Sequence, residues 1–219
     1  MKLVIKMNIY KPIINNLYDE FNLHLLIEQY KKDGISIENK SFNNIEEIDL
    51  NCEEIEFEKC VFRNCKIVGN LERASFHDII FENCDFSNCI FKEGSFIRVE
   101  IKNCKMVGCD FSDSRIYHFT CNESNFEYAN FSNTNFEGVL FENCDLSSVA
   151  FSECKFKNIY FEKSKLIYTQ FFGTKLNNID VSSCEMYGIV TKMEDIKGLI
   201  VNNFQAIELS KLMGIVVKD

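Results

Sequence analysis

Apolar residues return at every fifth position between Leu71 and Val201. Of the 27 positions in this series, 26 are apolar and 14 are Phe, and only Thr191 is polar. An apolar stripe on an α-helix needs a spacing near 3.6 residues, so a period of five excludes a helical core. One buried position that is filled again and again by a large side chain indicates a tandem repeat.

A second inward position lies two residues before each member of the series. It holds mostly small or branched residues, such as Ala74, Cys84 and Val99. Two inward side chains separated by one outward side chain predict a short β-segment, because side chains alternate between the faces of a strand. The two residues after each apolar position are mostly polar and break the alternation. Five residues therefore predict one wall and one corner of a coil.

A slower period of 20 residues gives the number of walls. The earlier inward position is bulky at Ile79, Val99, Phe119, Val139, Ile159, Ile179 and Leu199. It is small at Cys84, Cys104, Ser124, Cys144, Ser164 and Cys184. Because stacked residues share an environment, we predict four walls per coil and an all-β solenoid over residues 51–201. The spacing slips once, by one residue, between Ile67 and Leu71.

Several stretches of this region carry a recurring five-residue pattern: CDFSN, ANFSN, TNFEG and CDLSS. They resemble the pentapeptide-repeat family, whose pattern is a small residue, Asp or Asn, Leu or Phe, and two variable residues. The resemblance implies a right-handed quadrilateral β-helix. The handedness comes from the resemblance alone.

The two ends of the chain differ in pattern from the repeats. We predict that residues 1–50 form an N-terminal capping segment, with one helix over residues 16–32 that stops at Gly34. At the other end, Asn202 and Gln205 have the spacing of a capping box. We predict that residues 202–219 form a capping helix, ended by Gly214, and a short apolar strand over residues 215–217.

The tail resembles the end of the bacterial quinolone-resistance pentapeptide proteins. That resemblance implies a tail-to-tail homodimer, and its candidate contacts are Leu209, Leu212, Met213, Ile215 and Val217. It also implies a protein partner, DNA gyrase or topoisomerase IV, which is bound by imitation of B-DNA and protected from quinolones. The alternative is a structural or protein-interaction scaffold with another partner.

Charge narrows the choice of partner. The formal net charge is −9, whereas direct nucleic-acid binding requires a basic surface. No Lys or Arg occurs from Ile116 to Ala150, and this stretch has five acidic residues, which we call the acidic belt: Glu123, Glu127, Glu137, Glu142 and Asp145. By spacing they project outward. The belt is either a surface that occupies a basic DNA-binding groove or an ordinary solvated face.

Eleven cysteines raise the question of disulfides and metals. The start of the chain has no secretory pattern, so we expect a cytoplasmic protein with reduced thiols and no membrane span. Cys84, Cys89, Cys104 and Cys109 could bring four thiols together, as in a structural zinc site. However, Ala and Ser fill equivalent positions, so we interpret Cys as a small core residue and expect no metal or cofactor.

Catalytic motifs are missing from the sequence. The three histidines, His24, His77 and His118, have no nucleophile or carboxylate at a useful spacing, and the latter two fall in outward positions. We therefore predict that the protein is not an enzyme. Outward apolar residues also pair at 20-residue spacing, Ile97 with Tyr117 and Leu140 with Tyr160, and could mark a contact surface.

Overall fold

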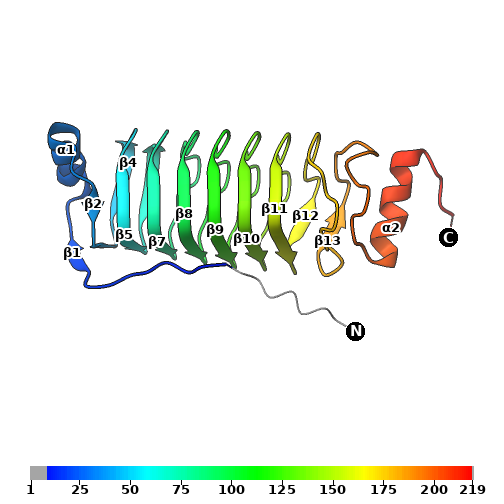
Figure 1. The fold of residues 1–219 in the computed structure, drawn as a ribbon, viewed down its shortest axis with the longest axis horizontal. Coiled ribbons are helices and arrows are strands. Elements are labelled where there is room, and N and C mark those ends of the chain that lie inside the picture. The colour runs from blue at the N-terminus through cyan, green and yellow to red at the C-terminus, as the bar shows by residue number, and fades with distance from the viewer. Residues whose placement is uncertain (1–8, 219) are drawn as a thin grey trace.

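The computed structural model describes residues 9–218, which form a β-solenoid with one helix at each end (Figure 1). The helices are α1 (Leu23–Asp33) and α2 (Asn203–Ser210), and a 3-10 turn, η1 (Lys211–Met213), follows α2. The strands are β1 (Tyr18–Glu20), β2 (Ile37–Glu38), β3 (Lys40–Asn43), β4 (Glu46–Asn51), β5 (Glu56–Arg63), β6 (Lys66–Asn70), β7 (Ser75–Glu82), β8 (Ser95–Lys102), β9 (Arg115–Asn122), β10 (Asn135–Glu142), β11 (Lys155–Glu162), β12 (Lys165–Ile167) and β13 (Glu185–Tyr187).

Left-handed backbone makes the corners. In most coils the second residue after the apolar position has positive φ, for example 54° at His118, 50° at Glu123 and 60° at Tyr128. This conformation turns the chain from one wall to the next without a loop. Asn and Gly adopt it most readily. The two consecutive outward residues that broke the alternation in the sequence are therefore the end of a wall and its corner.

Strands of successive coils are parallel and in register at 20-residue intervals. Phe96 pairs with Ile116 and Val99 with Phe119, and the order β7-β8-β9-β10-β11 follows the chain. Each of these eight-residue strands covers two walls, and the other two walls are joined by single bridges such as Asp110 to Asn130. The predicted period and the four-walled solenoid are confirmed.

Phenylalanine rings fill the interior in columns. Phe111 stacks on Phe91 and on Phe131, with ring centroids 4.8 and 4.7 Å apart and planes within 9° of parallel. Phe151 and Phe171 extend the same column. All five rings are buried, so the apolar series does point to the axis. Stacked aromatic pairs add to the free energy that their burial contributes.

The slip in the period lies at Gly69. Ile48 pairs with Val68, 20 residues on, but Leu50 pairs with Gly69, only 19 residues on. A Cβ atom at Gly69 would lie 2.0 Å from the carbonyl oxygen of Leu50. The shortened coil thus brings two backbones so close together that only glycine fits.

The N-terminal segment is more regular than predicted. The helix forms and ends at Gly34 with φ of 66°, but it begins at Leu23, because Tyr18–Glu20 form β1 instead. Strand β3 pairs with β5, and the ring of Phe42 stacks on Phe62 at 4.6 Å. The ladder therefore begins before the boundary that we placed at residue 50.

The C-terminal segment caps the last coil. The predicted capping box of Asn202 and Gln205 opens α2, and Gly214 ends η1 with φ of 75°. Residues 215–217 form no strand, because no strand edge lies beside them in the described chain. Among residues 9–218, no helix is long and apolar enough to cross a membrane.

Candidate functional site

The surface of the solenoid consists of four walls, which we name from the coil that begins at Phe119. Wall A is 119–122, wall B is 124–127, wall C is 129–132 and wall D is 134–137, each with its equivalents 20 residues away. The interior is filled by buried apolar side chains. Ligands and partners can therefore meet only the outward side chains of these walls, the corners and the two ends.

The small inward position is a hydrogen-bond donor site. Cys109 Sγ donates to the carbonyl oxygen of Phe86 at 3.0 Å, Ser114 Oγ to Phe91 at 3.1 Å and Thr134 Oγ1 to Phe111 at 2.8 Å. Six other cysteines make the same bond to the preceding coil: Cys60, Cys65, Cys84, Cys89, Cys154 and Cys184. From the sequence we interpret Cys at this position only as a small core residue, and that interpretation misses its role as a hydrogen-bond donor.

Burial also keeps the thiols protonated. It raises the pKa of Cys89 and of Cys154 to about 12. The thiolate, not the thiol, is the nucleophile and the metal ligand. The backbone bonds place Cys84 and Cys104 in one column and Cys89 and Cys109 in another. Within residues 9–218, no three His, Cys, Asp or Glu side chains are grouped to hold a metal ion.

The five residues of the acidic belt face outward but lie on three walls. Glu142 is on wall A, Glu127 and Asp145 are on wall B, Glu137 is on wall D, and Glu123 forms the corner between walls A and B. Their exposure is intermediate, except that Glu123 is exposed. Glu123, Glu142 and Asp145 thus lie at or near the corner between walls A and B, whereas Glu127 lies at the other edge of wall B, beside the corner with wall C.

Lysines of the next coil neutralise two members of the belt. Lys157 Nζ lies 2.6 Å from Glu137 and Lys165 Nζ lies 3.0 Å from Asp145. Burial acts to raise the pKa of Asp145, but hydrogen bonds from Ser147 and Lys165 lower it overall. Among residues 9–218, no cationic group lies within 4.0 Å of the carboxylates of Glu123, Glu127 and Glu142. These three supply the unneutralised charge of the belt.

The two outward histidines, His77 and His118, are partly covered by neighbouring side chains. His77 contacts the guanidinium of Arg98 and lies 3.7 Å from Asp78. His118 packs against the ring of Tyr10, with centroids 4.6 Å apart. Residues near the N-terminus thus cover part of the solenoid, which the sequence pattern did not indicate. The apolar pairs Ile97 with Tyr117 and Leu140 with Tyr160 do stand side by side on neighbouring strands.

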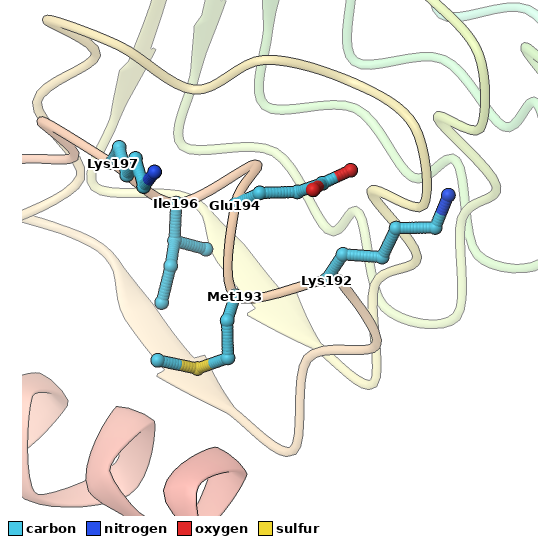
Figure 2. A pocket seen from close by; sticks show the side chains of 5 residues that line it. All are labelled: Lys192, Met193, Glu194, Ile196 and Lys197. Carbon is cyan, nitrogen blue, oxygen red and sulfur yellow. The ribbon is translucent and has the colours of Figure 1, made fainter.

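A shallow hollow lies on the last, irregular coil, where the apolar series is broken at Thr191. Figure 2 shows that Met193 points toward helix α2, whereas Lys192 and Glu194 point away from it. Lys192 Nζ lies over the ring of Phe172, 4.2 Å from its centroid. The hollow contains no pair of groups arranged for proton transfer or nucleophilic attack.

The C-terminal end is covered by a polar contact and exposes apolar side chains outward. Gln205 Nε2 donates to the carbonyl oxygens of Val181 at 2.9 Å and Cys184 at 2.8 Å, and so covers the edge of the last coil. Of the predicted dimer contacts, Leu209 packs against the core, and the other four are exposed: Leu212, Met213, Ile215 and Val217.

Three further apolar residues at this end were missed by the sequence interpretation. Phe204 and Val216 are each 82 % exposed, and Ile207 is also exposed. The positions of Phe204 and Ile207, three residues apart in a helix, could have revealed them, because such residues share a face. Together with the four exposed predicted residues they form what we call the C-terminal apolar face.

Comparison with known families gives two matches in the centre of the solenoid. Residues 74–147 match the family described as "Pentapeptide repeat region", and residues 144–182 match "Pentapeptide repeats (8 copies)". The two matches overlap and follow the uninterrupted part of the five-residue period.

Two curated relatives are similar over a stretch of 118 residues. The quinolone resistance pentapeptide repeat protein QnrB96 of Scandinavium goeteborgense is 29 % identical, and the pentapeptide repeat protein QnrB4 of Escherichia coli is 26 % identical. Each match covers 48 % of this chain and 55 % of the relative. The chain thus spans about half the length of the curated relatives that it matches.

A solved structure shows the same fold. The crystal structure of HetL, a pentapeptide repeat protein involved in heterocyst differentiation regulation in the cyanobacterium Nostoc, aligns with a TM-score of 0.50. The alignment covers 84 % of this chain and 98 % of HetL at 13 % identity. At that identity the likeness concerns the fold alone.

Proposed function

The chain belongs to the pentapeptide-repeat family, and we propose that it binds a type II DNA topoisomerase, DNA gyrase or topoisomerase IV, and protects it from quinolones. The observation that carries this proposal is the similarity over 118 residues to a quinolone resistance pentapeptide repeat protein. In this role the protein acts by binding, without catalysis. Its filled interior and its protonated, buried thiols support a binding role.

The shape of the solenoid supports imitation of a DNA duplex. Coils stack at about 4.8 Å, the spacing of neighbouring strands, so the walls form a straight rod with a regular surface. A rod of this kind can enter a groove that is shaped for double-stranded DNA. The partner would then meet repeated outward side chains in place of phosphates.

The charge of the belt supports the imitation only on wall B and at its corner with wall A. B-DNA carries one negative charge per ~1.7 Å, which is about six over the ~10 Å rise of two coils. Over a similar length the belt offers three carboxylates that have no cationic partner in the described chain: Glu123, Glu127 and Glu142. We therefore propose wall B, with its corner to wall A, as the surface that meets the basic groove of the partner.

A gyrase supercoiling assay, with and without a fluoroquinolone, tests the proposal. We expect micromolar protein to restore supercoiling in the presence of the drug. A variant that combines Glu123→Gln, Glu127→Gln and Glu142→Gln should lose this effect. A matched control has amides at three acidic corner positions between walls C and D: Glu93→Gln, Asp113→Asn and Glu153→Gln. Unchanged enzyme behaviour with the wild-type protein would rule the proposal out.

A scaffold for another protein is the second candidate. It is favoured by the spread of the belt over three walls and by the lysines that neutralise Glu137 and Asp145. Affinity capture from cell extract separates the two candidates. Recovery of a protein that is not a topoisomerase, lost in the Gln variant but retained in the control, would favour the scaffold.

A further inference from the structure

Residues 9–17 lie along the outside of the solenoid and make contacts that cross several coils. In the main sheet β1 is followed by β3, β5, β7, β8 and β9 in that order. Traced from β1 toward the N-terminus, the chain runs along the outside of the rod as far as β9 (Figure 1). Coils of a solenoid otherwise contact only their neighbours. This segment is therefore placed to join coils that have no other direct contact.

Two contacts fix the segment on the corner between walls D and A. The backbone N–H of Ile13 donates to Asp78 Oδ1 at 2.9 Å, on β7. Three residues earlier, the Tyr10 ring meets the edge of His118 on β9, at 4.6 Å and an interplanar angle of 74°. Asp78 and His118 are corner residues two coils apart, about 10 Å along the rod. Three residues of extended chain span that distance.

The solenoid side of this contact is a charged cluster around a buried carboxylate. The Asp78 side chain is only 2 % exposed and accepts two hydrogen bonds from Arg98, at 2.6 and 2.7 Å. The Ile13 N–H therefore meets a carboxylate whose position is already fixed by the next coil. A bond to an ionised acceptor is stronger than a neutral one. His118 Nδ1 is also buried and has no hydrogen-bond partner among residues 9–218.

We propose that residues 9–17 form a clasp that ties β1 to the coils of β7 and β9, so that the N-terminal coils open together rather than one at a time. The clasp also occupies the corner between walls D and A along Asp78, Arg98 and His118. Partners are then directed to the remaining surfaces. Release of the clasp would loosen the first coils and uncover the charged cluster in one step.

Amide hydrogen exchange on the full chain tests the clasp. We expect the Ile13 amide to exchange at least ten-fold more slowly than an unstructured amide. Tyr10→Ala should speed exchange at Ile13 and also in β1 and β3, which Tyr10 does not touch. The matched control is Tyr128→Ala, at an exposed corner between walls B and C, and it should change neither.

A second pair of variants tests the hydrogen bond without altering the solenoid. Ile13→Pro removes the N–H that donates a hydrogen bond to Asp78, whereas Ile14→Pro introduces the same ring one residue later. We expect only Ile13→Pro to speed exchange in β1 and β3 by about the same factor as Tyr10→Ala. Free exchange at Ile13 in the wild-type protein, or effects confined to the amides beside the altered residue, would overturn the proposal.

Discussion

Individual residues in this fold are selected by two demands that repeat every five positions. The corner requires positive φ, which Asn83, Asn103 and Asn143 adopt. Stacked Asn side chains add to this preference: Asn103 Nδ2 donates to Asn83 Oδ1 at 2.8 Å. The small inward position favours a donor to the preceding coil, although Ala74 and Ala129 fill it without one. Both demands are met by short side chains, and they account for the frequent Asn, Ser, Thr and Cys.

The phenylalanine columns predict an unequal response at two adjacent positions. Phe131 is fully buried between Phe111 and Phe151, so Phe131→Ala should lower the free energy of unfolding by about 3–5 kcal/mol through the cavity it leaves. Ser132 faces outward, and Ser132→Ala should be nearly neutral. Chemical denaturation of both variants measures the difference. Equal costs would contradict the inward assignment of the ring.

The cysteines predict a thiol count that depends on folding. All eleven are free and buried, and burial raises the pKa of Cys89 to about 12. We expect a thiol reagent at pH 8 to label none of them rapidly in the folded protein and all eleven in denaturant. Rapid labelling of one thiol in the folded state would identify a reactive cysteine that the structure does not explain.

The sequence predicted these positions but not their chemistry. Ala74, Cys84 and Ser124 have similar sizes, and size was all that a single five-residue pattern could compare. Yet Ala74 has no side-chain donor, Cys84 Sγ donates to the carbonyl oxygen of Phe62, 22 residues earlier, and Ser124 Oγ accepts from the Cys104 N–H. Such bonds join different coils, so they emerge only once the coils are stacked. The inward series itself was predictable because its period is short and nearly unbroken.

Among the elements, the terminal helix predicts a measurable cap. Gln205 is buried and bonds two carbonyl oxygens of the last coil, so Gln205→Leu leaves both without that donor. Loss of buried hydrogen bonds should lower the free energy of unfolding by about 1–3 kcal/mol. Asn203→Ala, at an exposed position in the same helix, is the control. Similar melting temperatures for the two variants would argue against the cap.

The irregular last coil predicts a dependence on pH. The hydrogen bond from Lys175, at 2.8 Å, lowers the pKa of Asp195, and the Gly173 N–H adds to this effect. A carboxyl whose pKa is lower in the folded state stabilises the fold above its unfolded pKa and loses that contribution as pH falls through the folded value. Stability should therefore fall below about pH 4.

The acid loss attributed to Asp195 can be separated from that of other carboxyls. Asp195→Asn should show a shallower decline in melting temperature between pH 4 and pH 2 than the wild-type protein. The control is Asp180→Asn, which alters an exposed carboxyl one coil before the same end. Parallel curves for wild type and Asp195→Asn would show that Asp195 contributes nothing to the loss of stability at low pH.

Prediction of the elements failed where pairing, rather than local pattern, decides the structure. Tyr18–Glu20 form a strand because they pair with β3. Their local sequence pattern is helical, so the predicted helix extends across them. Residues 215–217 have strand-like composition but lie beside no edge in the described chain. In contrast, the capping box at Asn202 and both glycine stops were predictable, since their signals lie within a few residues.

At the scale of the whole molecule, exposed apolar side chains gather at the two ends and on the clasp, where Tyr10 and Ile13 are exposed. Between residues 49 and 167, the large apolar residues that are exposed are Ile90 and Tyr128. The clasp and the distribution of charge over the walls could not be predicted, because both depend on residues from distant coils. The middle of the rod is thus suited to a charged partner, whereas the ends are suited to apolar contacts.

The C-terminal apolar face predicts a dimer that is joined tail to tail. Phe204 and Val216 are each 82 % exposed, and an apolar surface of this kind is stabilised by burial against a second copy. Light scattering should then give about 51 kDa, twice the 25.6 kDa of the chain. Phe204→Glu should reduce the mass to that of one chain.

The N-terminal end supplies the control for this prediction. Phe21 is 77 % exposed there, and Phe21→Glu introduces the same charge at the opposite end of the rod, so it should leave the mass of the dimer unchanged. If both variants dissociate, the contact is not confined to the tail. If the wild-type protein is a single chain at tens of micromolar, the apolar face serves a different partner, and the surface of Glu123, Glu127 and Glu142 acts from one rod alone.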